Sequence, residues 1–80
     1  MSERRLSEMR RGAVVVVTRL CEADESMLHK LLALGVVPGD RLRVRATRPV
    51  LVFDVAASSY AVDRELASRI FVCDVPANDP

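Results

Sequence analysis

The segment from Leu31 to Ala46 changes from a helical to a strand-like hydrophobic pattern within one short turn. Leucines finish an apolar helical stripe before Gly35, which supplies the positive φ that ends many helices. Pro38 and Gly39 then favour a chain reversal. In residues 41–46 arginines alternate with apolar residues, the period of two that is typical of a strand with one wet and one dry face. The sequence therefore predicts a helix beside a small sheet.

The helix is expected to begin after Asp24, a good N-cap residue, and to end at about Leu34. Its apolar stripe, predicted to cover one open end of the sheet, consists of Met27, Leu28, Leu31, Leu32 and Leu34. Ser26, His29 and Lys30 are predicted on the solvent side.

Five segments are predicted to be strands, and their residue ranges are 14–20, 41–46, 50–56, 60–62 and 70–75. The first is continuously apolar, which indicates contact on both faces or a face covered by the following helix. In the second, Leu42, Val44 and Ala46 are expected to point inward. In the third, Asp54 marks the outer face because an unpaired buried carboxylate is costly. Leu51, Phe53 and Val55 then face the core, and Val50 and Val52 share the outer face with Asp54.

Short connections complete the predicted fold. Leu6 and Met9 belong to a turn or short helical loop that places two apolar side chains on the domain. Ala57–Ser59 is expected to form a turn, and Asp63 to cap a short helix over residues 64–68. The whole is mainly β with short helices, a single domain over residues 1–80 with a core at about 6–75.

Composition narrows the function classes. Half of the 80 residues are hydrophobic, and the formal net charge is only +1, so global electrostatics does not favour nucleic acid or anionic lipid. The longest apolar run, Ala13 to Val17, is too short to cross a bilayer, and a cytoplasmic protein is expected. Cys21 and Cys73 are interpreted as packed thiols, although a barrel could also bring them close together.

The sequence shows no recognisable catalytic or metal-binding constellation. Its one histidine, His29, is predicted on a wet helical face, and no motif places a base beside Ser58 or Ser59. His29, Cys21 and Cys73 are too scattered for a ligand cluster. We therefore predict no enzyme activity, no catalytic or cofactor-binding residues and no metal ligands.

A mixed basic and apolar surface is the strongest candidate for function. Arg41, Arg43 and Arg45 project from one strand face, with Val50 and Val52 nearby on the next strand, a composition suited to protein contact. The plainer interpretations are a solvated strand face and valines covered by the first strand or the N-terminal segment. Pairing between two copies would also explain the exposed valines. Nucleic-acid binding ranks lower because Tyr60 stands alone and Phe53 and Phe71 are expected inside.

Three motifs follow one another along the chain: Leu31-x-x-Leu34-Gly-Val-x-Pro-Gly-Asp40 with alternating Leu42 and Val44, then Tyr60-Ala-Val62, and finally Ala67-x-x-Ile70-x-Val72. Together they resemble the FeoA domain. FeoA-like sequences commonly carry a glycine where Ala57 aligns and a basic residue where Asp63 stands. The resemblance implies a small SH3-like β-barrel with a helix inserted after the first strand, a fold similar to the C-terminal module of DtxR-type repressors.

The resemblance also implies a function, because FeoA-like proteins are associated with transition-metal homeostasis. It implies a non-enzymatic accessory protein of ferrous iron uptake that docks on the cytoplasmic GTPase portion of a FeoB-type transporter and meets the membrane only through that partner. The alternatives are a free-standing SH3-like regulatory module of a metal-dependent transcription complex and a small-barrel nucleic-acid binder.

Overall fold

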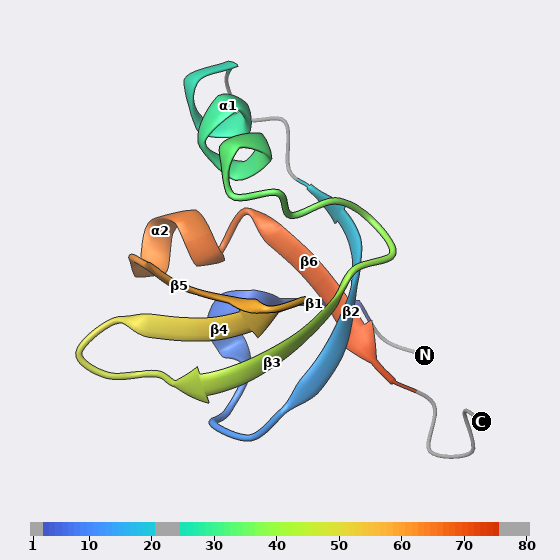
Figure 1. Ribbon diagram of the computed structural model, residues 1–80, viewed down its shortest axis with the longest axis vertical. Coiled ribbons are helices and arrows are strands. Elements are labelled where there is room, and N and C mark those ends of the chain that lie inside the picture. Colours follow the sequence, from blue (N-terminus) through green and yellow to red (C-terminus); the bar gives the residue numbers. More distant parts are fainter. Residues whose placement is uncertain (1–2, 21–24, 76–80) are drawn as a thin grey trace.

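A computed structural model describes residues 3–20 and 25–75 of the chain, and it shows a six-stranded antiparallel sheet (Figure 1). The strand order is β1-β6-β2-β3-β4-β5. The elements are β1 (Arg4–Arg5), the 3-10 turn η1 (Leu6–Glu8), β2 (Val14–Leu20), α1 (Glu25–Ala33), β3 (Arg41–Ala46), β4 (Leu51–Val55), β5 (Ser58–Val62), α2 (Arg64–Ala67) and β6 (Ile70–Asp74). The predicted fold class, mainly β with short helices, is confirmed.

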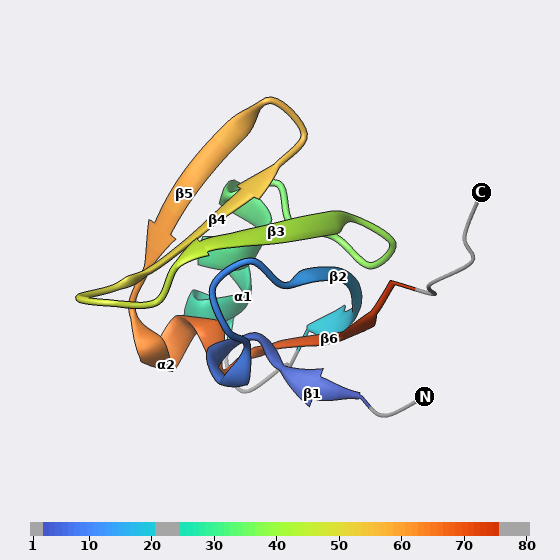
Figure 2. The same ribbon diagram turned by 90° about the horizontal axis from the view of Figure 1, so that it is seen from below.

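The sheet curls, and in the view from below α2 and η1 lie side by side between its two edge strands (Figure 2). The edge strands are β1 and β5. The turn η1 directly follows β1, α2 directly follows β5, and these two segments contact each other. Asp63 caps α2 as predicted, since its Oδ1 accepts a hydrogen bond of 2.7 Å from the Leu66 N–H. Two short helical turns thus close the gap that the strands leave.

Among the described residues, the core is aliphatic apart from Met9 and Phe53. Its buried members are Leu6, Met9, Val15, Val17, Leu31, Val36, Leu42, Val44, Leu51, Phe53, Val62, Ala67, Ile70 and Val72. Every strand from β2 to β6 contributes, so each strand buries one face. The inward orientation predicted for Leu42, Val44, Leu51 and Phe53 is confirmed, as is the burial of Leu6 and Met9.

Helix α1 lies over one end of the barrel (Figure 1). Leu31 is fully buried there, but Leu32 is 49% exposed, so the prediction that Leu32 belongs to the buried stripe is wrong. Adjacent helical positions differ by about 100°, and only one of the pair can face the barrel. The exposure of Ser26, His29 and Lys30 is confirmed. The predicted cap Asp24, Cys21 and the side chains of Met27 and Leu28 lie outside the described part.

Two expectations for β6 are wrong. Phe71, predicted inside, is half-buried on the outer face because Ile70 and Val72 take the inward positions of the strand. Cys73 shares that outer face and is a half-buried free thiol, not a packed core residue. Cys21 lies outside the described residues, so the structure does not test whether the two cysteines are close.

The β4–β5 hairpin turns at Ala56 and Ala57, between the paired residues Val55 and Ser58, so Ser58 and Ser59, predicted in the turn, belong to β5. Among the described residues, Ala56 is the one non-glycine residue with a positive φ, 53°. Short hairpin loops favour glycine at such a position because a Cβ is strained there by about 1–2 kcal/mol.

Replacing Ala56 with glycine should therefore stabilise the protein. The relief of strain exceeds the extra freedom that glycine gives the unfolded chain, and we expect a net gain of about 0.5–1 kcal/mol in the free energy of unfolding. Urea denaturation followed by circular dichroism measures it. The control Ala57→Gly, at a position without positive φ, should lower stability; equal effects of the two variants would contradict the argument.

Candidate docking surface

Valine and arginine side chains gather on the outer face of β2, β3 and β4. In each strand the alternate residues are buried, so the remaining ones point away from the core. We call this surface the valine–arginine face, and its residues are Val14, Val16, Arg41, Arg43, Arg45 and Val52. The outward orientation predicted for the three arginines and for Val52 is confirmed. Their role in docking stays a prediction.

Strand pairing brings these residues into cross-strand rows. Val14 stands opposite Arg43, which stands opposite Asp54 in β4, and Val16 pairs with Arg41. Val14 is 41% exposed and Val16 is half-buried, so the first strand does not contact other elements on both faces as expected. Its outer residues Val14 and Val16 add apolar area to the face, and they do not cover Val52. Sequence parity could not indicate this, because the register shifts between Val17 and Arg19, so exposed Arg19 does not mark the outer positions of the valine run.

The acid on this face is engaged within the molecule. Asp54 accepts a hydrogen bond from the Ser59 hydroxyl and forms an ion pair of 3.4 Å with Arg45 Nη1. Arg45 sits at the irregularity where the β3–β4 register shifts. Arg11, which sequence reasoning missed, lines a shallow hollow together with Arg43, Arg45 and Asp54. Three arginines and one carboxylate line this hollow, and the local charge is positive.

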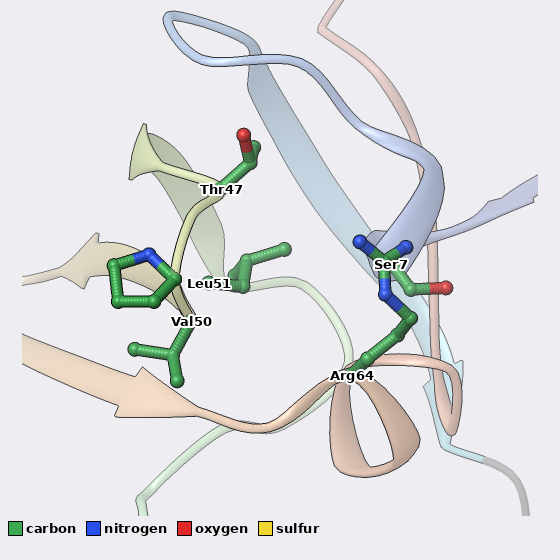
Figure 3. A pocket seen from close by; sticks show the side chains of 6 residues that line it. Ser7, Thr47, Val50, Leu51 and Arg64 are labelled. Carbon is green, nitrogen blue, oxygen red and sulfur yellow. The ribbon is translucent and has the colours of Figure 1, made fainter.

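Val50 lies at the boundary of a second feature, a small pocket shown in Figure 3. It lies in the bend that precedes β4 and is 40% exposed. The pocket is lined by Ser7, Thr47, Pro49, Val50, Leu51 and Arg64. The sequence predicted Val50 in one surface with Arg41, Arg43 and Arg45. The structure places it beside α2, in the lining of a different pocket.

The outer face near β1 and β6 is paired internally in a different way. The Arg19 guanidinium lies 4.0 Å from the Phe71 ring centroid, and that of Arg5 lies 5.6 Å away. Glu3 accepts hydrogen bonds from the Thr18 hydroxyl (2.6 Å) and Arg19 Nε (3.0 Å), and these two bonds lower the pKa of Glu3 below its ordinary value. Arg4 forms an ion pair of 2.9 Å with Asp74. These contacts tie β1 to its neighbours.

The residues that the structure describes form an open, arginine-lined hollow of about 430 Å³ but no cluster of metal ligands. They contain no group of three or more His, Cys, Asp or Glu side chains close enough to hold a metal ion. The pocket beside α2 has a volume of about 40 Å³, room for a few water-sized groups. Cofactor and metabolite sites are usually about 300–1,000 Å³, so this pocket accepts a side chain at most. No helix in the described part is long and apolar enough to cross a membrane.

Comparison with known proteins assigns this barrel to a family. The FeoA domain model matches residues 4–73, and the chain belongs to that family. A crystal structure of FeoA, called an iron uptake regulatory protein, superposes with a TM-score of 0.85 at 24% identity, covering 94% of this chain and 100% of that one. A search of curated proteins finds no match.

Two further structures define the relationship. FeoA from Stenotrophomonas maltophilia, crystallised with zinc and described as a procaryotic SH3 domain protein, is 28% identical with a TM-score of 0.74, covering 86% of this chain and 88% of that one. A manganese-dependent transcriptional repressor bound to manganese is 25% identical with a TM-score of 0.87, covering 94% of this chain and 38% of the repressor. The predicted SH3-like barrel and its likeness to repressor modules are confirmed.

Proposed function

We propose that this protein is a non-enzymatic accessory factor of ferrous iron uptake that docks on the cytoplasmic GTPase portion of a FeoB-type transporter. The observation that carries the proposal is membership of the FeoA family over residues 4–73. The S. maltophilia relative has been put forward as a bacterial ferrous iron transport activating factor. A cytoplasmic location follows from this proposed partner.

The valine–arginine face is the proposed contact surface. Val14 and Val52 offer apolar area, and Arg11 and Arg43 supply positive charge around it. Interfaces of this composition bury apolar side chains at the centre while charges orient the partner. An acidic, partly apolar surface on the transporter complements it.

The test is binding of the purified protein to the soluble cytoplasmic fragment of the transporter from the same organism. We expect Val52→Asp to weaken binding at least tenfold, because it places a carboxylate in a desolvated contact. Leu32→Asp is the control: Leu32 is 49% exposed, whereas Val52 is half-buried on the outer face of β4, and Leu32 lies on α1 at the end of the barrel. Isothermal titration calorimetry measures both affinities, and circular dichroism verifies folding.

Each outcome of this experiment has a definite meaning. Loss with Val52→Asp and full binding with Leu32→Asp supports both the function and the face. Loss of binding with Leu32→Asp and full binding with Val52→Asp would support the proposed function but place the contact surface on α1. Absence of wild-type binding contradicts the proposed partner.

A regulatory module acting with a transcription complex is the second candidate, and the structural match to the manganese-dependent repressor favours it. The chain spans about two fifths of that repressor, so the remainder would have to come from another polypeptide. Co-purification with a DNA-binding protein in place of a transporter would support this candidate.

A further inference from the structure

We propose that the pocket between α2 and the β3–β4 connection binds an acidic side chain of the partner, a carboxylate carried on an aliphatic stem. The inference rests on the proposed function and names the chemistry by which the same partner is recognised. Figure 3 shows the polar and apolar side chains that surround the pocket.

Three segments that are distant in the sequence supply the polar groups. Ser7 comes from η1, Thr47 follows β3, and Arg64 begins α2. Within the described part of the chain, the Arg64 guanidinium has no ion pair or hydrogen bond, and neither side-chain hydroxyl has a partner. The Arg64 guanidinium therefore borders the pocket with its hydrogen-bonding capacity unused by the fold, whereas the Ser7 hydroxyl points away from Thr47 and Leu51 (Figure 3).

The remaining wall of the pocket is apolar. Leu51 is buried and its side chain points into the space between Thr47 and Arg64 (Figure 3), while Pro49 and Val50 complete the lining. A carboxylate matches the guanidinium fork, and Thr47 lines the same space beside it. The methylene stem of an acidic residue matches the apolar wall. A phosphate dianion has no such stem, and it would lose part of its hydration shell against that wall at a cost in free energy.

Volume and position also select a side chain as the occupant. About 40 Å³ accommodates a carboxylate group and excludes a nucleotide or a metabolite. Val50 borders the pocket, is 40% exposed, and stands two positions before Val52 in the chain. A partner on the valine–arginine face can therefore place one acidic residue in the pocket as an anchor next to the larger contact.

Two measurements on the full-length protein test the proposal. The first is a titration of the labelled wild-type protein with N-acetylglutamate methylamide, followed by amide chemical shifts of Ser7, Thr47 and Leu51. The second is the affinity for the transporter fragment of Arg64→Gln and of the control Arg48→Gln, an exposed arginine next to the pocket that does not line it.

We expect saturable shifts in the wild-type protein that disappear in Arg64→Gln. We also expect affinity for the fragment to fall about tenfold with Arg64→Gln and less than twofold with Arg48→Gln. Thr47→Val, which keeps the shape of the side chain, should produce a smaller loss. Equal thermal unfolding of the variants shows that folding is not the cause.

The contrary outcomes are distinct. Absence of saturable shifts, or equal fragment affinities for the two arginine variants, overturns the proposal. Equal shifts with inorganic phosphate, together with competition by phosphate, assign the pocket to a free anion and overturn it as well. If the wild-type protein does not bind the fragment, the proposed function fails, and the acidic side chain can no longer be assigned to the transporter. The titration with N-acetylglutamate methylamide still reports whether the pocket binds a carboxylate.

Discussion

Replacement of Phe53 by alanine is expected to remove about 3–5 kcal/mol from the free energy of unfolding, the largest effect of any single truncation in this core. Phe53 is the largest fully buried side chain, and its ring lies 5.9 Å from that of Tyr60 in β5 at a tilt of 44°. Truncation loses the transfer free energy of the ring, leaves a cavity in a tightly packed interior, and breaks this ring contact.

The size of the protein makes that loss severe. A domain of 80 residues has about 4–12 kcal/mol of stability in total, so the variant is expected to be largely unfolded or to melt far below the wild type. Urea denaturation monitored by circular dichroism measures the change. Phe53→Leu, expected to cost only about 1–1.5 kcal/mol, keeps the experiment informative if the alanine variant does not fold.

Phe71→Ala is the matched control for Phe53→Ala. Phe71 is half-buried on the outer face, where Arg5 and Arg19 lie against its ring, and such contacts contribute about 0.5–1 kcal/mol each at exposed sites. We expect its truncation to cost less than half as much as that of Phe53. Equal losses would mean that the outer face contributes to stability as much as the core.

The two phenylalanines also show where sequence reasoning succeeds and fails. Phe53 could be placed because Asp54 beside it fixes the parity of β4: the carboxylate must face water, so its neighbours face the core. Strand β6 carries no such marker within the apolar run from Ile70 to Cys73. Phe71 is held outside by guanidinium groups from β1 and β2, and those pairings are long-range contacts that periodicity does not encode.

The candidate surface follows the same rule. The alternation of Arg41, Arg43 and Arg45 with Leu42 and Val44 is local information, and it predicts the orientation of the ladder correctly. The pocket beside α2 was not predictable, because Ser7, Thr47 and Arg64 belong to three segments that only the closed barrel brings together. Arg11 joins the arginines for the same reason, since the Gly12 N–H donates to the Val44 carbonyl across the strands, at 2.8 Å.

Adjacent leucines of α1 should respond to truncation very differently. Leu31→Ala is expected to lower the free energy of unfolding by about 2–4 kcal/mol, because Leu31 is fully buried in the core cluster and its removal leaves a cavity under the helix. Leu32→Ala should change stability by no more than about 0.5 kcal/mol, because that side chain is 49% exposed.

Both substitutions replace leucine with alanine in the same turn of one helix, and alanine has the higher helix propensity at either position. Helix propensity therefore cancels in the comparison, and the difference between the two variants measures the packing of α1 against the barrel. Urea denaturation of the wild-type protein and both variants gives that difference directly. Similar losses for the two leucines would mean that α1 does not pack on the barrel through Leu31, and that the helix is not fixed over this end of the sheet.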